Sequence, residues 1–232
     1  MTRRRATIAA ASWILGAGVF AAPAPAEERS SVIGTVHNLS ASGPGSVRAL
    51  SETEVCKFCH VPHNAVVPTP LWGHALSDAS YRTPVLRRGR ADARPAPQPD
   101  GSSRLCLSCH DGTVALGDVS GEPRPIAMSA GRDRLRPGDR GYLGTDLSGS
   151  HPVSFVVPDG RQADPGEEDD LTLRPLALIR ADPDVRLDDA GKMQCTTCHD
   201  PHSDPFSSGG TVPRFWVKPS FDEVCTVCHA PG

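Results

Sequence analysis

The chain has 232 residues, of which 27 are Asp or Glu and 24 are Lys or Arg, so its net charge at pH 7 is −3. A phosphate-binding surface requires an excess of basic residues, which this chain does not have, so we do not expect nucleic acid as a partner. Aromatic residues make up 5% of the chain, which also holds 22 Gly and 23 Pro. Side chains alone would then bury little surface, which leaves partial disorder or a core filled by another group.

Residues 1–26 are predicted to be a secretory signal peptide. The arginines at 3–5 precede the apolar run "ATIAAASWILGAGVF", and Ala24-Pro25-Ala26 resembles a small-residue cleavage site. The apolar run is shorter than the roughly 20 residues that a membrane-spanning helix needs. Cleavage after Ala26 would remove three arginines and no acids, which leaves 21 basic and 27 acidic residues, a net charge of −6. We therefore expect residues 27–232 to be exported to the periplasm or the cell exterior without membrane insertion.

All eight cysteines fall into Cys-x-x-Cys-His motifs, the attachment sequence of c-type haem. Two thiols about one helical turn apart can form thioethers with the two vinyl groups of one haem, and the next residue supplies the proximal imidazole. In chain order the first to fourth motifs are Cys56-Cys59-His60, Cys106-Cys109-His110, Cys195-Cys198-His199 and Cys225-Cys228-His229. The sequence therefore predicts four covalently bound haem c groups, whose macrocycles would supply the missing apolar bulk.

Disulfides and zinc are the alternatives to haem for these cysteines. Disulfides are the usual state of an even cysteine count in an exported protein, and zinc ribbons also use Cys-x-x-Cys pairs. Neither would require a histidine after every second cysteine, so four such motifs favour haem.

Five histidines outside the motifs are candidate distal ligands: His37, His63, His74, His151 and His202. Four irons need four distal ligands if all are six-coordinate, so the supply exceeds the demand by one. Methionine is the competing ligand, and removal of the signal peptide leaves only Met128 and Met193. Bis-histidine ligation is therefore expected, with low reduction potentials, because methionine ligation raises the potential.

Two of these histidines follow a motif histidine by three positions. They are His63 in "CKFCHVPHNA" and His202 in "CTTCHDPHSD". A residue so close to a proximal ligand lies near the same side of that porphyrin, so each is expected to ligate a different haem. Pro62 and Pro201 restrict the backbone between each pair of histidines. The haems would then lie close enough to exchange electrons.

Little regular structure is predicted between the motifs. Segments 87–104 and 158–170 are rich in Pro, Gly and charge and are predicted to be surface loops. The alternation in "HPVSFVV" predicts a short strand that starts near His151. His74 lies beside Trp72, and for it packing or a hydrogen bond to a haem propionate is the alternative to ligation.

The predicted fold is mostly irregular. Short helical turns at the haem motifs and a few short strands are expected to wrap around stacked haems in a single domain. A faint repeat supports duplication of a haem-binding unit, because "EVCKFCHVP" at 54–62 differs from "EVCTVCHAP" at 223–231 in three positions. The second copy ends where the first has His63, so the last haem must take its distal ligand from upstream or from another molecule.

The sequence resembles multihaem c-type cytochromes with paired Cys-x-x-Cys-His motifs, especially the tetrahaem type that includes extracellular cytochrome filament subunits. Six stretches carry this resemblance: "GTVHNLS", "CKFCHVPHNA", "PLWGHALSDASY", "LCLSCHDGTVALGDV", "DLSGSHPVSF" and "CTTCHDPHSDP". The resemblance implies closely spaced bis-histidine haems, electron transfer with other redox proteins, and head-to-tail assembly into a homopolymer. Gly73 departs from it, because similar proteins often have Asn there, and this bears on the role of His74.

Three functions are compatible with these haem motifs and histidines. An exported electron carrier, which is not an enzyme, passes electrons without catalysis and is favoured. A reductase of nitrite, hydroxylamine or a similar small molecule needs one iron with an open position, often with Lys in place of the proximal His, and all four motifs end in His. A filament subunit would share the carrier's haem chemistry, with the surplus histidine as a ligand to the neighbouring copy's haem.

Overall fold

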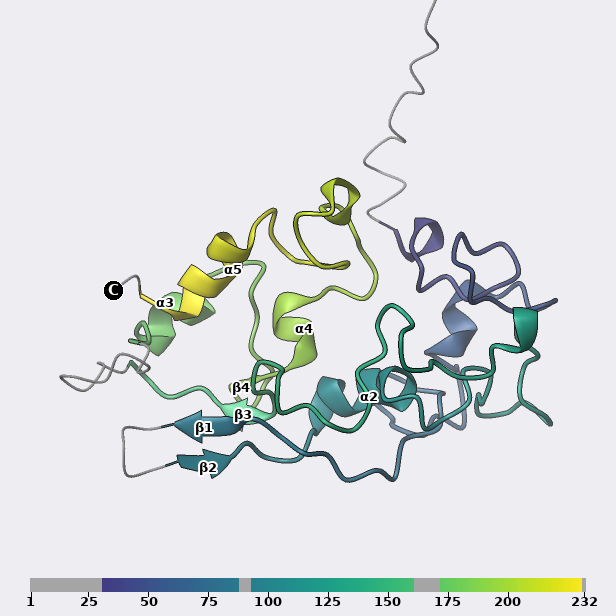
Figure 1. The fold of residues 1–232 in the computed structure, drawn as a ribbon, viewed down its shortest axis with the longest axis horizontal. Coiled ribbons are helices and arrows are strands. Elements are labelled where there is room, and N and C mark those ends of the chain that lie inside the picture. The colour runs from purple at the N-terminus through teal and green to yellow at the C-terminus, as the bar shows by residue number, and fades with distance from the viewer. Residues whose placement is uncertain (1–30, 88–92, 161–171, 231–232) are drawn as a thin grey trace, which may run out of the picture.

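The structure is a computed structural model that describes residues 31–87, 93–160 and 172–230 (Figure 1). The predicted signal peptide lies outside the described residues. Most of the described chain is irregular, and its helices and strands are short. In this part of the chain, no helix has the length and apolar character that crossing a membrane requires.

Each haem-attachment motif lies on or at the end of a helical segment. These segments are η2 (Val55–Phe58), α2 (Gly101–His110), α4 (Cys195–Cys198) and α5 (Phe221–Cys228). In the first, third and fourth motifs the histidine amide donates to the carbonyl of the first cysteine, at 2.8, 3.1 and 2.9 Å. This bond is that of an α-helical turn, so the spacing of the motif itself brings its three side chains to one face.

Capping residues explain where α4 and α5 begin. The Ser220 hydroxyl accepts a hydrogen bond from the Glu223 amide at 3.2 Å, which satisfies a free donor of the first turn of α5. Asp222 and Glu223 place negative charge at the same end, where the helix dipole favours it. Before α4, the Gln194 amide donates to Thr197 Oγ1 at 3.0 Å as part of a capping box.

The strands form two small antiparallel pairs. Strand β1 (Val85–Arg87) pairs with β2 (Ala93–Pro95), with Val85 opposite Pro95. The prediction of a surface loop over 87–104 is therefore wrong in part, because β2 and the first turn of α2 lie within it. The strand forms because its backbone pairs with a segment earlier in the chain, a contact that local composition does not report.

The second pair consists of β3 (Phe155–Val156) and β4 (Lys192–Met193), with Phe155 opposite Met193. The predicted strand after His151 is thus confirmed, although it is shorter than the alternating pattern. The remaining elements are single turns: η1 (Val32–Gly34), η3 (Ser129–Gly131), α3 (Leu176–Arg180) and η4 (Ser207–Gly209).

Buried apolar side chains form four separate small clusters in the described chain. Three of them contact motif cysteines. Cys59 and Cys109 pack against the cluster of Phe58 and Leu116, and Cys198 packs against both clusters around the fourth motif. The prediction of a thin side-chain core and a mostly irregular fold is confirmed, because such small clusters bury little surface for a chain of this length.

Candidate haem-attachment sites

The imidazoles of the first three motifs are each held by a backbone carbonyl. The contacts are His60 Nδ1 to Pro70 O at 2.8 Å, His110 Nδ1 to Gly141 O at 2.6 Å and His199 Nδ1 to Arg214 O at 3.0 Å. When Nδ1 donates to a carbonyl, the neutral ring keeps its lone pair on Nε2, which is the form that binds a metal. His229 differs, because its Nδ1 is buried without a partner among the described residues.

Three motif histidines face a second imidazole from a distant part of the chain. The ring centroids are 6.1 Å apart for His60 and His202, 6.0 Å for His110 and His37, and 6.3 Å for His229 and His151. Two imidazoles on opposite sides of one metal, each bonded at about 2 Å, have their centroids roughly 6 Å apart. The described residues therefore fit an iron between each pair of rings.

Two of these facing histidines are also held through Nδ1. His37 Nδ1 lies 3.0 Å from Pro201 O, and His151 Nδ1 lies 2.8 Å from Pro152 O. The His37 ring stacks on Phe215 at a centroid distance of 4.0 Å. Burial lowers the pKa of His37 to about 4, so its imidazole is neutral at pH 7 and keeps a lone pair for a metal.

His202 is exposed, as is His151, whereas His37 is half-buried. Its Nδ1 lies 3.5 Å from the Asp200 carboxylate. The His60 and His202 rings are nearly parallel, with 17° between their planes. This places the side chain that follows the third motif beside the histidine of the first motif.

His63 and His74 do not face another imidazole among the described residues. His63 is exposed, and its Nδ1 lies 3.3 Å from Asn64 Nδ2. His74 is fully buried, with Nδ1 2.9 Å from Ala75 O and Nε2 3.0 Å from Ala115 O. Both nitrogens of His74 are thus occupied, and Nε2 also lies 3.5 Å from Cys109 Sγ.

In the described chain, His199 of the third motif is the one motif histidine that has no second imidazole opposite it. The His199 ring instead packs edge-on against Trp216 at 5.1 Å. The competing methionines lie in apolar clusters that also contain motif cysteines. Met128 is buried in the cluster with Phe58, and Met193 is buried beside Val157.

Cys59, Cys109 and Cys198 pack against apolar clusters, whereas Cys56 and Cys225 are exposed. Burial raises the pKa of Cys59 to about 11 and that of Cys109 and Cys198 to about 12. All eight cysteines are free of disulfide bonds in the structure. Within the described ranges, no group of three or more His, Cys, Asp or Glu side chains is arranged to hold a metal ion.

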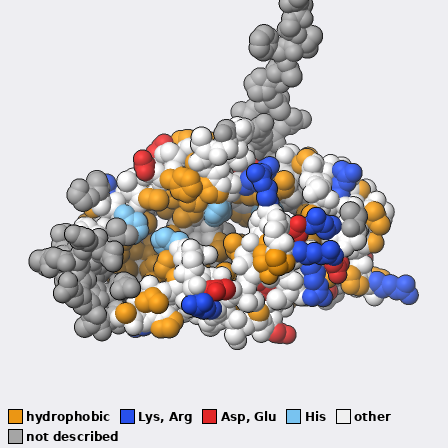
Figure 2. All heavy atoms as spheres, viewed as in Figure 1, with side chains coloured by type: hydrophobic (Ala, Val, Ile, Leu, Met, Phe, Trp, Pro, Cys, Tyr) orange, Lys and Arg blue, Asp and Glu red, His pale blue; other side chains and the backbone are white. Residues whose placement is uncertain are grey.

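Neighbouring motifs lie next to each other in space. Cys59 and Cys109 share one apolar cluster, the Cys106 thiol is hydrogen-bonded to Cys195, and Cys198 packs with Cys228. Ser103 on α2 links the second and third motifs, since its hydroxyl lies 3.0 Å from the Cys195 amide. Figure 1 shows α5, α4 and α2 in sequence along the long axis, and Figure 2 shows histidines around a hollow on the same face.

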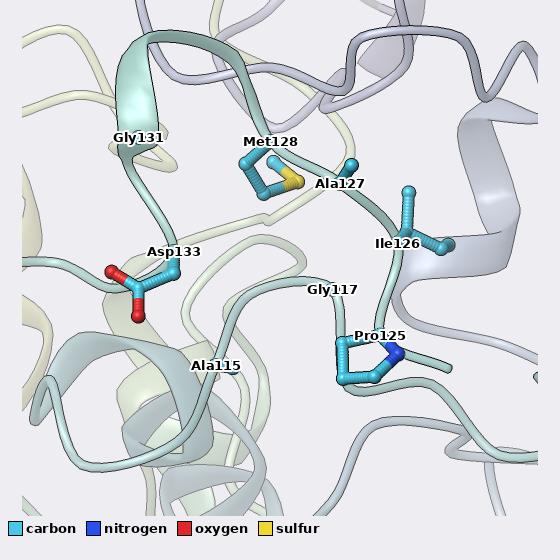
Figure 3. Close-up of a pocket in the computed structure, with 8 residues that line it drawn as sticks. All are labelled: Ala115, Gly117, Pro125, Ile126, Ala127, Met128, Gly131 and Asp133. Atoms are coloured by element: carbon cyan, nitrogen blue, oxygen red, sulfur yellow. The ribbon is translucent and has the colours of Figure 1, made fainter.

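A separate cavity of about 290 Å³ lies beside the first two motifs (Figure 3). It opens between the loop at 115–117 and the segment at 125–133, and Asp133 is its one charged side chain. Its lining residues are Ala115, Gly117, Pro125, Ile126, Ala127, Met128, Gly131 and Asp133. No histidine or cysteine lines this cavity, so it is not one of the attachment sites.

The turns that carry the cysteines, the oriented imidazoles and the hollow define a class of protein that holds haem c through thioethers. Comparison with known proteins agrees, because residues 189–232 match the Doubled CXXCH motif family. This match covers the third and fourth motifs and supports a multihaem c-type cytochrome whose chemistry is electron transfer. No curated protein matches the chain.

The backbone carbonyls that orient the motif imidazoles could not be identified from the sequence. Every residue type has a carbonyl, so residue identity carries no signal for Pro70 or Arg214. Gly141 is a partial exception. Its φ is +85°, and a Cβ there would lie 3.1 Å from His110 Cε1.

Proposed function

We propose that the protein is an exported electron carrier in which four covalently bound haem c groups each have two histidine ligands. The observation that carries this proposal is the set of three imidazole pairs with centroids 6.0–6.3 Å apart. When bound, haem c supplies reversible one-electron chemistry. The chain orients three motif imidazoles through backbone carbonyls, packs Cys59, Cys109, Cys198 and Cys228 in apolar clusters and brings successive sites together.

From these pairs we infer the distal ligands of three sites: His202 for the first motif, His37 for the second and His151 for the fourth. We infer the distal ligand of the third site from His63 and His202, which each follow a motif histidine by three positions. His202 follows the third motif and lies opposite the first, so the reciprocal exchange would take His63, which follows the first motif, to the iron of His199. His74 then remains as the surplus histidine, held by two carbonyl groups.

Replacement of single histidines tests the ligand assignment. We expect His202→Ala to convert one haem in four from low-spin to high-spin in the ferric protein, because its iron loses one strong-field ligand. The measurement is electron paramagnetic resonance combined with visible spectroscopy. His74→Asn is the control and should leave every haem low-spin. An unchanged spectrum of His202→Ala would contradict the assignment.

One observation favours a second function. Since His199 has no facing imidazole among the described residues, an open iron there would suit a reductase of a small nitrogen compound or a similar oxyanion. The discriminating experiment adds cyanide or nitrite to the ferric wild-type protein. An electron carrier with four six-coordinate irons should bind neither quickly. Rapid binding at one haem per chain would favour the reductase.

The exposed His63 supports a further proposal, that copies assemble head to tail into an extracellular filament. In that arrangement His63 would ligate the third haem of the next copy instead of the third haem of its own chain, so that haem ligation would also join the copies. Electron microscopy of wild type and His63→Ala tests this. We expect the variant to lose filaments and to gain one high-spin haem per chain. Filaments of normal length in the variant would rule out ligand sharing through His63.

A further inference from the structure

The residue after the motif histidine differs among the four sites. It is Val61, Asp111, Asp200 and Ala230 in chain order. Asp111 is 2% exposed, whereas half of the Asp200 side chain is exposed. The second motif is therefore the one followed directly by a buried acid.

Hydrogen bonds hold Asp111 in its ionised form. The Tyr81 hydroxyl donates to Oδ2 at 2.6 Å, and the Thr113 amide and hydroxyl donate to Oδ1 at 2.7 and 2.8 Å. Both carboxylate oxygens of Asp111 accept hydrogen bonds, which is the arrangement expected for an ionised carboxylate. Burial acts to raise the pKa of Asp111, but hydrogen bonds from Ser77, Tyr81 and Thr113 outweigh it and keep the pKa below its usual range.

This charge has no compensating cation in contact. Among the described residues, no Lys or Arg forms an ion pair with Asp111. Arg104 on α2 acts on Tyr81 through its charge, but its side chain is exposed and screened by solvent. A hydrogen-bonded anion in this setting acts on its neighbours more strongly than one in water.

We propose that Asp111 lowers the reduction potential of the haem attached at Cys106 and Cys109 by holding a buried negative charge at the residue that directly follows its ligand His110. The inference rests on the proposed function. Reduction adds one electron to the ferric site and no proton, so a fixed anion nearby favours the oxidised form. Asp200 likewise follows His199 in the sequence, but half of its side chain is exposed and solvent screens its charge. The second site should therefore have a lower potential than it would without this acid.

Charge-removing and charge-retaining variants of the haem-loaded full chain test this role by redox titration followed spectroscopically. In Asp111→Asn we expect one of the four midpoint potentials to rise by about 59 mV, about a tenfold change in a one-electron equilibrium. Asp189→Asn removes an exposed acid that lies outside the motifs; it is the control and should shift the potentials by much less. Asp111→Glu keeps the charge and should retain a potential near that of wild type, which a purely structural role would not predict.

Equal shifts in the Asp111→Asn and Asp189→Asn variants, or no shift in either, would overturn the proposal. If Asp111→Asn does not load haem, Asp111→Ser removes the charge while keeping an acceptor for the Thr113 amide, and the same rise is expected. The ferric spin state separates this inference from the proposed function. High-spin iron in the wild-type protein contradicts bis-histidine ligation, whereas low-spin iron with unmoved potentials contradicts the role of Asp111 alone.

Discussion

At the scale of single residues, ligand orientation depends on atoms that sequence patterns do not report. The His110 imidazole is aimed by the carbonyl of Gly141, and Gly141 must adopt a positive φ for its carbonyl to reach Nδ1 at 2.6 Å. A side chain at this position would meet the ring itself, with its Cβ 3.1 Å from Cε1. A glycine in an irregular segment thus contributes to the second site without carrying a functional group.

We expect Gly141→Ala to perturb the second haem in particular. The new methyl group would push on the His110 ring, and the left-handed backbone would cost about 1–2 kcal/mol besides. Gly138→Ala is the matched control, since Gly138 also has a positive φ but a Cβ there meets nothing within 4 Å. Both variants should lose stability, and only Gly141→Ala should change the electron paramagnetic resonance signal of one haem. The same change in both would contradict the role of Gly141.

At the scale of elements, ion pairs join segments that the small apolar clusters alone hold weakly. Lys218, before α5, lies 3.1 Å from Asp182 and 3.2 Å from Asp184, both of which follow α3. Asp182 also accepts hydrogen bonds from the Asp184 and Val185 amides. Val185 is buried in the cluster that contains Trp216, so this contact fixes the chain beside the third and fourth motifs.

Asp182 predicts how stability depends on pH in this region. Burial acts to raise its pKa, but the hydrogen bonds from Val185, Asp184 and Lys218 outweigh it and hold the pKa below the usual 3.8. A lowered carboxyl pKa stabilises the fold fully above pH 3.8, and this contribution is lost as the pH falls through the folded value. We expect Asp182→Asn to lower the free energy of unfolding at pH 7 by roughly 1–2 kcal/mol.

Denaturant unfolding followed by circular dichroism between pH 7 and pH 3 measures this effect. The wild-type protein should lose stability at the acid end more steeply than Asp182→Asn. Asp189→Asn, at an exposed position, is the control and should behave as wild type. Parallel pH profiles for wild type and Asp182→Asn would show that this carboxylate does not stabilise the native state.

At the scale of the whole molecule, the four motifs form a connected series although the chain has no large side-chain core. The first and second, second and third, and third and fourth motifs each share a cysteine contact. His202, which follows the third motif, faces His60 and so links the third motif to the first. The third motif thus lies next to each of the other three motifs, which makes it the junction of the proposed electron path.

The sequence predicts the local features and fails on the distant ones for a physical reason. Cys-x-x-Cys-His spacing dictates a helical turn, so each motif and its helix can be located directly. The imidazole partners are more than 70 residues apart, and the irregular chain between them has no periodicity that would predict which rings meet. For the same reason, local composition does not predict that β2 pairs with β1.

The central claim is that each haem iron is held by one motif histidine and one distant histidine. A structure of the haem-loaded protein that resolves the iron ligands tests it most directly. We expect iron between His60 and His202, between His110 and His37, and between His229 and His151. A different distal ligand, or none, at any of these three irons would contradict it.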